Sequence, residues 1–348
     1  KCAPHSAIGA AINTVKPLID DTGLWLHCNS DTYNPLAVMS ITLAQRVENR
    51  AGGGIMMPTA LTTWRTPVPM NDIPIGIAGF GTYFPARIET AADLAGPTGI
   101  PADVIETKMG LRQRHVAGPD DTVSAMASRA AQQAIAMAGV APARIGMVIS
   151  HGSEFKDHVV WNAAGKIQHN VGAVNAFAFE VYALCAGAPI ALNVARSMMQ
   201  TDDRLEYALL AAASRENDLV SPGNQRARFM FNFGTGGGAM LLQRGAQKNL
   251  VLGAAALTDG SLSETVIITR EPEAVGSGPT ANGDIYGMLD VQNADYMAER
   301  LNEVSLPNFV RVIREAVEKS GASLDDVKFL GLVHMKRSFF VQILESIG

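Results

Sequence analysis

The chain has 348 residues, of which 47% are hydrophobic and 18% are charged, and its formal net charge is −5. This composition is typical of a globular protein with a sizeable core, and without a long run of either charge it argues against a dedicated nucleic-acid binder or a polybasic membrane binder. Its three widely spaced cysteines do not form a disulfide framework, and they favour a reducing cytoplasmic location.

Residues 1–69 give weak structural signals. A helix is predicted over residues 37–49, and it is followed by three glycines and a stretch rich in Thr and Pro. Because the hydrophobic periodicity is poor, we interpret residues 1–69 as an extension or linker without a core of its own. A small domain is the alternative. Residues 1–14 lack the pattern of a secretory signal, and no segment of the chain has the length of apolar sequence that spans a membrane.

From residue 70 the sequence alternates between predicted strands and helices. An apolar strand over residues 73–80 leads into a predicted turn at 81–85, and a helix is predicted over 122–138 behind Thr122 as N-cap. The later predicted elements are strands at 145–150, 176–182, 207–212, 238–242 and 250–256, and helices at 186–199 and 306–320. Such alternation with nearly continuous apolar strands predicts a layered α/β fold with a buried sheet, whose second half opens near residue 250.

Cys185 lies where the predicted strand 176–182 passes into a helix. At a helix N-terminus the exposed N–H groups and the helix dipole favour a thiolate, and they can also hold an oxyanion. The small neighbours Ala186 and Gly187 leave room for an acyl thioester. This pattern predicts a nucleophilic cysteine, and the alternative is an inert buried cysteine, which is the common state of this residue.

The chain has seven histidines, and any of them is a candidate for a catalytic partner of the cysteine. His151 and His334 each follow a predicted apolar strand directly, but only His334 also opens a predicted helix. The carboxyl ends of strands are where α/β folds place functional groups. An imidazole there can donate to a thioester carbonyl or accept a proton from a nucleophile. Taken alone, His334 fits a structural residue better.

Four segments together carry a family likeness. They are residues 178–187 (Ala-Phe-Glu-Val-Tyr-Ala-Leu-Cys-Ala-Gly), 109–117, 233–239 and 332–334. On these segments, residues 73–348 resemble the β-ketoacyl-acyl-carrier-protein synthase III group of the thiolase superfamily. The resemblance implies an α/β, five-layered αβαβα fold with two similar halves. Residues 70–249 then form the N-terminal half with the nucleophilic cysteine, and residues 250–348 form an incomplete C-terminal half.

The same resemblance implies an acyltransferase of fatty-acid or polyketide-type synthesis, acting as a cytoplasmic homodimer without a cofactor. Cys185 would take an acyl group from acyl-CoA, and a malonyl thioester on an acyl carrier protein would lose CO₂ and attack that group. His334 would stabilise the enolate oxygen, and the N–H of Cys185 would contribute to an oxyanion hole. Two alternatives stay open, namely a non-decarboxylating acyltransferase or thiolase-like enzyme, and a non-catalytic partner subunit.

The chain departs from the family pattern at several positions. A Trp and an Arg that grip CoA in the family correspond to Val104 and Lys108, which removes stacking surface. A Phe that floors the acyl pocket corresponds to Val160, which implies room for a longer or branched acyl chain. The Asp of the family's glycine-rich loop is Thr235. We find no counterpart of the family's final Asn and oxyanion loop, so we expect the C-terminal half to be incomplete.

Basic residues are the remaining candidates for binding. Arg226 and Arg228, with Arg112 and Arg114, are candidates to contact a phosphate or the acidic carrier protein, because arginine suits phosphate recognition. Lys108 is a further candidate, at the position of the family's CoA-binding arginine. The alternative is that these arginines are solvated surface residues or members of internal ion pairs.

Two further motifs carry less weight. The glycines of residues 234–238 lack the Lys-Ser/Thr of a phosphate-binding loop, so they predict a tight turn before a strand. His27 and Cys28 are adjacent, which fits zinc-ligand spacing poorly, and we therefore expect no metal site.

Overall fold

The computed structural model describes residues 24–27, 39–45, 73–152, 154–268, 288–332 and 337–348. Within these residues nine strands form one mixed sheet, in the order β13-β1-β2-β10-β3-β9-β8-β6-β7. Their bounds are β1 (Leu24–His27), β2 (Met39–Gln45), β3 (Ile75–Tyr83), β6 (Ile145–Ser150), β7 (Phe177–Glu180), β8 (Tyr207–Ser214), β9 (Gly236–Arg244), β10 (Leu250–Leu257) and β13 (Val327–Gly331). Two small sheets pair β4 (Ile88–Thr90) with β5 (Gln113–His115), and β11 (Val266–Ile267) with β12 (Asp290–Val291).

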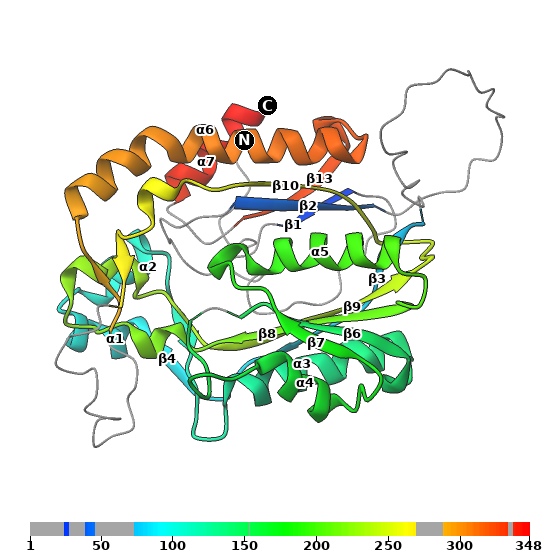
Figure 1. Cartoon of the computed structure of the whole chain (residues 1–348). Helices are drawn as coiled ribbons and strands as arrows, with labels where there is room; N and C mark the ends of the chain where they lie inside the picture. The colour runs from blue at the N-terminus through cyan, green and yellow to red at the C-terminus, as the bar shows by residue number, and fades with distance from the viewer. Residues whose placement is uncertain (1–23, 28–38, 46–72, 153, 269–287, 333–336) are drawn as a thin grey trace, which may run out of the picture.

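Helices cover the sheet on its outer faces and also fill the space between its two parts. The helices are α1 (Ala91–Thr98), α2 (Ala102–Lys108), α3 (Val123–Ala138), α4 (Ala163–Val171), α5 (Gly187–Thr201), α6 (Ala294–Ser320) and α7 (Arg337–Ile347). In Figure 1, α6 and α7 lie above β10, β13, β1 and β2, while α5 lies between these strands and those of the first half, and α3 and α4 lie below. This arrangement confirms the predicted five-layered αβαβα fold.

The two parts of the sheet meet between β10 and β3. These strands are antiparallel and share a single registered pair, Leu250 with Gly76. A side chain at Gly76 would place its Cβ only 2.5 Å from the backbone oxygen of Lys248, so the residue must be glycine for the chain to pass this closely. The sheet can therefore fold over α5 at this junction.

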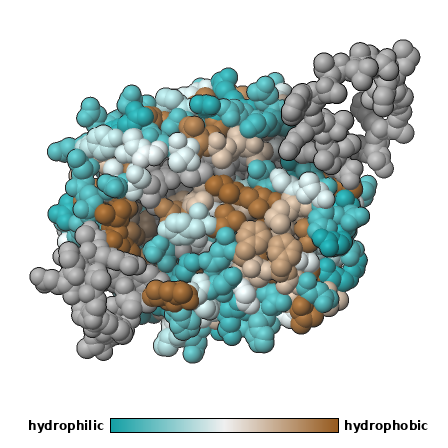
Figure 2. Space-filling model, viewed as in Figure 1, coloured by the Kyte–Doolittle hydropathy of each residue, from teal (hydrophilic) through white to brown (hydrophobic). Residues whose placement is uncertain are grey.

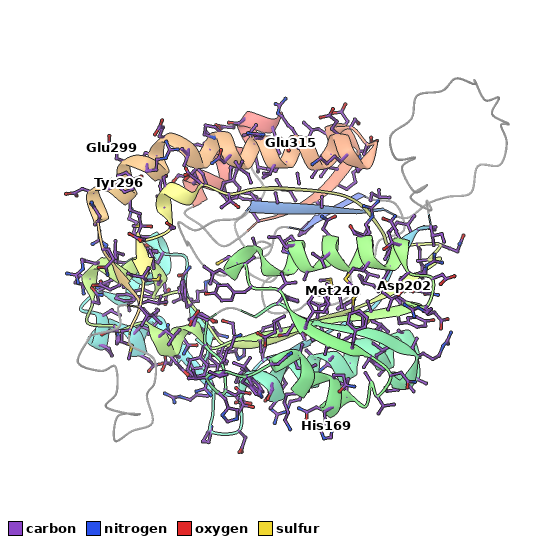
Figure 3. All side chains as sticks on the ribbon, viewed as in Figure 1. His169, Asp202, Met240, Tyr296, Glu299 and Glu315 are labelled. Atoms are coloured by element: carbon purple, nitrogen blue, oxygen red, sulfur yellow. The ribbon has the colours of Figure 1, made fainter. Side chains whose placement is uncertain are left out.

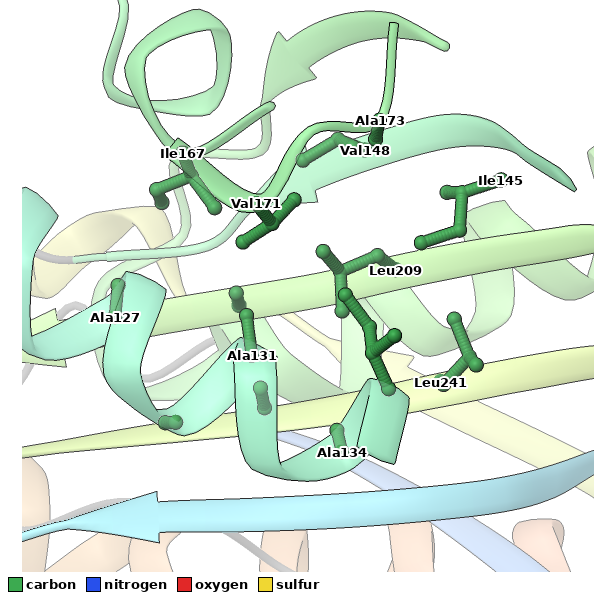
Figure 4. Close-up of a cluster of buried hydrophobic side chains, with 14 of the residues drawn as sticks. Ala127, Ala131, Ala134, Ile145, Val148, Ile167, Val171, Ala173, Leu209 and Leu241 are labelled. Atoms are coloured by element: carbon green, nitrogen blue, oxygen red, sulfur yellow. The ribbon is translucent and has the colours of Figure 1, made fainter. Parts of the chain in front are cut away.

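The core of the first half lies between its strands and the helices α3 and α4. Ala127, Ala131 and Ala134 of α3 face Leu209 and Leu241 of the sheet (Figure 4), and all five are fully buried. Small side chains on α3 allow the helix to approach the sheet closely, and at interior density such contacts account for much of the packing energy. A second apolar cluster fills the other face of these strands, where Met240 of β9 lies beneath α5 (Figure 3).

Most elements agree with the sequence predictions. The predicted N-cap of α3 is confirmed, because the Thr122 side chain accepts a hydrogen bond from the N–H of Ala125 at 3.2 Å. The α6 helix begins well before the predicted residue 306, and it continues through Pro307. The strand β3 runs to Tyr83, so the turn predicted at residue 81 begins later.

The helix predicted over residues 37–49 is wrong, because the structure has the strand β2 there. Apolar side chains at positions 39, 41 and 43 alternate with small or polar ones at 40, 42 and 44, and this period of two is typical of a strand. Partners on both sides of β2 stabilise this conformation. The predicted domain boundaries stay a prediction.

The surface of the described residues is mixed in character. In Figure 2, apolar residues gather in the middle of the face in view, between more hydrophilic regions above and below. No helix that the structure describes combines the length and the apolar character needed to cross a bilayer.

Candidate active site

Cys185 lies in a short 3-10 turn, Leu184–Ala186, between β7 and the start of α5. The residue is half-buried and is not part of a disulfide. The predicted position at a helix N-terminus is thus confirmed. Leu184 directly before it has a φ of 48°, a left-handed conformation that non-glycine residues seldom adopt. Such strain is held only by the surrounding structure, and here it makes the sharp strand-to-helix turn that carries the cysteine.

The start of α5 packs against the end of β6. A Cβ on Gly187 would lie 2.7 Å from the backbone oxygen of His151, so only glycine allows this contact without a shift of the backbone. Burial lowers the pKa of His151 to about 4, which keeps its imidazole neutral at physiological pH. A neutral imidazole therefore lies close to the first turn of the helix that follows Cys185.

Acidic side chains lie around Tyr182, three residues before the cysteine. The phenol of Tyr182 donates a hydrogen bond to Oε2 of Glu154 at 2.7 Å. The pKa of Tyr182 is raised, first by burial, then by this hydrogen bond, and further by the negative charges of Glu154, Glu216 and Cys185. Two carboxylates and the sulfur therefore act on the same phenol.

The carboxylate of Glu216 is fixed within this cluster by two donors. It accepts hydrogen bonds from the hydroxyl of Ser214 and from the N–H of Phe155, the latter at 3.2 Å. Sequence reasoning missed Glu154, Tyr182 and Glu216. The sequence gives a partial indication for Glu154 and Glu216, because each follows the end of a predicted strand. The two strands, β6 and β8, are parallel in the sheet, and their carboxyl ends lie at one edge.

Thr235, which takes the position of the family's loop Asp, makes hydrogen bonds that hold neighbouring segments of the protein together. Its side chain is buried and donates a hydrogen bond to Oδ1 of Asn217 at 2.5 Å, and its N–H donates to the backbone oxygen of His115 at 2.8 Å. The glycines that follow belong to the strand β9, which begins at Gly236, rather than to a turn before it. Thr235 therefore ties β9 to the loop after β8.

The other predicted site residues are spread over the structure. His334 lies outside the described residues, between β13 and α7. Val160 is fully exposed and has a φ of 51°. Lys108, Arg112 and Arg228 are exposed. The roles proposed for these residues stay predictions.

Arg226 forms an ion pair with Asp290, which agrees with the alternative that the arginines belong to internal ion pairs. Its Nε donates to Oδ1 of Asp290 at 3.1 Å, and this pairing helps to lower the pKa of Asp290 to about 2. The side chain of Arg226 is nevertheless 62% exposed, so its outer face is open to a ligand. Gln225 beside it donates to the backbone oxygen of Thr98 at 2.8 Å, which places this arginine segment next to α1.

We also searched the described residues for side chains that could bind a metal ion. There, no three His, Cys, Asp or Glu side chains are grouped as ligands for an ion.

The sequence is similar to bacterial condensing enzymes. Residues 179–260 match the 3-oxoacyl-(acyl-carrier-protein) synthase III family. Beta-ketoacyl-(acyl-carrier-protein) synthase III of Sodalis glossinidius is 34% identical over 50% of this chain and 54% of its own length. The enzyme of that name from Baumannia cicadellinicola is 31% identical over 60% and 63%, and that of Escherichia coli K12 is 28% identical over 72% and 82%. The chain thus spans less than two thirds of the first two relatives.

Solved structures show the same fold. A 3-oxoacyl-(acyl-carrier-protein) synthase III from Aquifex aeolicus matches with a TM-score of 0.65 and 22% identity, over 78% of this chain and 80% of that one. The priming beta-ketosynthase of a polyketide biosynthetic pathway matches with a TM-score of 0.65 and 23% identity, over 79% and 78%. OleA from Xanthomonas campestris, with cerulenin bound, matches with a TM-score of 0.57 and 17% identity, over 81% and 83%.

Proposed function

Because the chain belongs to the thiolase superfamily and is a relative of its β-ketoacyl-acyl-carrier-protein synthase III enzymes, we propose that it catalyses an acyl-CoA-primed condensation. In this reaction an acyl group is first carried on Cys185 and then joined to a malonyl thioester on an acyl carrier protein. The single observation that carries the proposal is the position of Cys185, in a strained turn between β7 and the N-terminus of α5.

The first half-reaction moves the acyl group from CoA to the cysteine. The dipole of α5 favours the thiolate over the thiol, so the sulfur attacks the acyl carbonyl and the CoA thiolate leaves. The same dipole stabilises the negative charge that develops on the carbonyl oxygen. The exposed cations Lys108, Arg112 and Arg228, with the outer face of Arg226, are the residues that we assign to the phosphates of CoA and to the acidic carrier.

The second half-reaction forms the carbon–carbon bond. The bond between the malonyl carboxylate and its α-carbon breaks, CO₂ leaves, and the electron pair forms the new bond to the acyl carbonyl carbon. The thiolate of Cys185 is then released. We assign the enolate oxygen to His334. Val160 is fully exposed, so the structure gives no support for a pocket floor at this position.

The acidic cluster favours one second candidate. A condensation without decarboxylation needs a base that removes a proton from the α-carbon of the second acyl group, and a carboxylate can act in this role. Glu154 and Glu216 bring such groups to the surroundings of Cys185. The two candidates share the acyl-cysteine step and differ in whether CO₂ is formed.

Intact-mass analysis after incubation with a series of acyl-CoA thioesters tests the shared step. We expect one acyl adduct on the protein and none on the Cys185→Ala variant, with the preferred donor reporting the size of the pocket. No adduct from any donor would overturn the proposal. Release of labelled CO₂ from malonyl-acyl carrier protein, dependent on prior acylation, then separates the decarboxylating reaction from the second candidate, which forms none.

A further inference from the structure

In the first half of the fold, the order of the strands along the chain differs from their order in the sheet. Along the chain its strands come in the order β3, β6, β7, β8, β9, and in the sheet they lie in the order β3-β9-β8-β6-β7. The fifth strand, β9, therefore lies between the first and the fourth and is antiparallel to both. The fourth strand, β8, is parallel to the second, β6.

The second half follows the same arrangement only if strands from the beginning of the chain are counted in it. Its first and second strands are β10 and β13, and two positions separate them in the sheet. The strand β2 fills the position of a fifth strand, antiparallel to β10 and β1. The strand β1 fills the position of a fourth, parallel to β13. Position and direction agree at each of the three pairings.

The connections repeat as well, which makes the two halves comparable element by element. The helix α3 ends at Gly139 with a φ of 64° and leads through a 3-10 turn into β6. The helix α6 ends at Gly321 with a φ of 74° and leads through a 3-10 turn into β13. The helix α3 packs on β3 and β9, and α6 packs on β10 and β2. The strand β2 thus meets its helix as β9 does.

The same two strands close the space around α5. This helix contacts β8, β6 and β3 of the first half on one side, and β2 and β10 on the other (Figure 1). Without β2, one side of α5 would lose part of its cover, and the facing edges of β10 and β13 would lack pairing partners. Exposed strand edges of this kind promote association with other chains.

We propose that residues 24–27 and 39–45 supply the fourth and fifth strands of the second half, rather than belonging to an extension outside the fold. The second half is then built from both parts of the chain, with its strands in the order fourth, fifth, first, second along the sequence. Its closing strand holds α5, and with it Cys185, from the side opposite to the first half. This inference rests on strand order and direction, and it does not depend on the reaction proposed above.

Engineered disulfides test the register directly. Ser40 pairs with Ala256, and Met39 pairs with Leu257, in the antiparallel ladder of β2 and β10. Adjacent pairs in such a ladder alternate in spacing, so one of the two double-cysteine variants has the closer geometry. The matched control, Ser40→Cys with Ala254→Cys, is two residues out of register, and its Cα atoms lie about 7–8 Å apart, beyond the reach of a disulfide.

We expect mild oxidation to link Ser40→Cys with Ala256→Cys, or Met39→Cys with Leu257→Cys, within one chain, at least about tenfold more than in the control. Peptide mapping by mass spectrometry identifies the linked residues and separates them from the native cysteines. A bond between two chains would mean that a second copy supplies the strands. No bond in either in-register variant would mean that β2 does not pair with β10 in the sheet. Either result overturns the proposal, and neither depends on catalytic activity.

Discussion

At the scale of single residues, the contact between Gly187 and His151 fixes where the nucleophile lies. The first turn of α5 lies so close to the backbone after β6 that a methyl group on Gly187 has no space. Cys185 is two residues from this contact, so its position depends on it.

We expect Gly187→Ala to move the start of α5, because its Cβ would lie 2.7 Å from a backbone oxygen. Acylation of Cys185 should slow by roughly 10- to 100-fold, since small displacements of reacting groups have effects of this size. The free energy of unfolding should fall by about 1–3 kcal/mol. Time-resolved mass spectrometry and urea denaturation measure the two effects. Gly165→Ala, in the first turn of α4, is the control, because its Cβ meets only ordinary contacts at 3.9 Å. Equal rates in the two variants would contradict the expectation.

The low pKa of His151 predicts a specific loss of stability in acid. The unfolded chain binds a proton at the ordinary pKa of 6.5, whereas the folded chain binds it only near 4. Above pH 6.5 the residue therefore has no effect, and between pH 6.5 and 4 it lowers the free energy of unfolding progressively, by up to about 3 kcal/mol.

His151→Gln should remove this part of the pH dependence. Urea denaturation at several pH values from 7 to 4.5 should give a shallower decline for the variant than for the unchanged protein. Other groups titrate in the same range in both proteins, so only the difference between the two curves is informative. Curves that stay parallel throughout would show that His151 is protonated equally in the folded and unfolded chains.

At the scale of elements, glycines let α3 lie directly on the sheet. A Cβ on Gly81 would lie 2.1 Å from the backbone oxygen of Ala130, and one on Gly237 would lie 2.7 Å from that of Met126. Gly238, the next residue of β9, has nothing within 4 Å of its Cβ position. Of these two adjacent glycines, only Gly237 is therefore required by the packing of α3 against β9.

We expect Gly237→Ala to lower the free energy of unfolding by about 1–3 kcal/mol, because the added methyl group forces α3 away from β9. Gly238→Ala should be neutral or slightly stabilising, since alanine restricts the unfolded chain more than glycine does. Thermal and chemical denaturation of the two variants provide the comparison. A loss of stability in Gly238→Ala equal to that in Gly237→Ala would refute the role assigned to the helix contact.

Elements with strong local signals could be predicted from the sequence. The strand β6 has the predicted bounds, and α3 begins at its predicted cap, because a continuous apolar run and a capping residue each act locally. The strand β2 was missed although its residues alternate with a period of two, because the segment is short and the neighbouring strands β1 and β10 that stabilise its extended conformation are not specified within it.

The candidate site could be predicted only where one segment contains it. Cys185 was identified because the strand, the cysteine and the helix are consecutive in the sequence. The approach of Glu154 and Glu216 to Tyr182 depends on how three strand ends meet in space, and the sequence does not specify that meeting. The left-handed conformation of Leu184 was also not predictable, because the residue type disfavours it.

At the scale of the whole molecule, β7 forms one end of the sheet and pairs only with β6 among the described strands. Phe177 at its start is 46% exposed, and Val174 just before it is 73% exposed. An open strand edge with apolar side chains is suited to pairing with a second copy of the chain. This edge fits the homodimer that the family resemblance implies.

We expect the double substitution Val174→Lys and Phe177→Lys to weaken the dimer by at least about tenfold, because it puts charges into an apolar interface. Sedimentation velocity over a range of concentrations measures the change. Met137→Lys on α3, where the residue replaced is 53% exposed, is the control for added surface charge. If the unchanged protein sediments as a monomer, or if both variants behave alike, β7 is not the dimer interface.

The pairing of Leu24 with Val327 has a consequence for how the protein is made. On the ribosome, β1 and β2 emerge before the other described strands, and β13 emerges about 300 residues after β1. At about 5–20 residues per second, the early strands wait roughly 15–60 seconds for that partner. During this time the first half can close on its own neighbouring segments. The yield of folded protein in the cell should therefore depend on translation speed and on chaperones that shield the waiting strands.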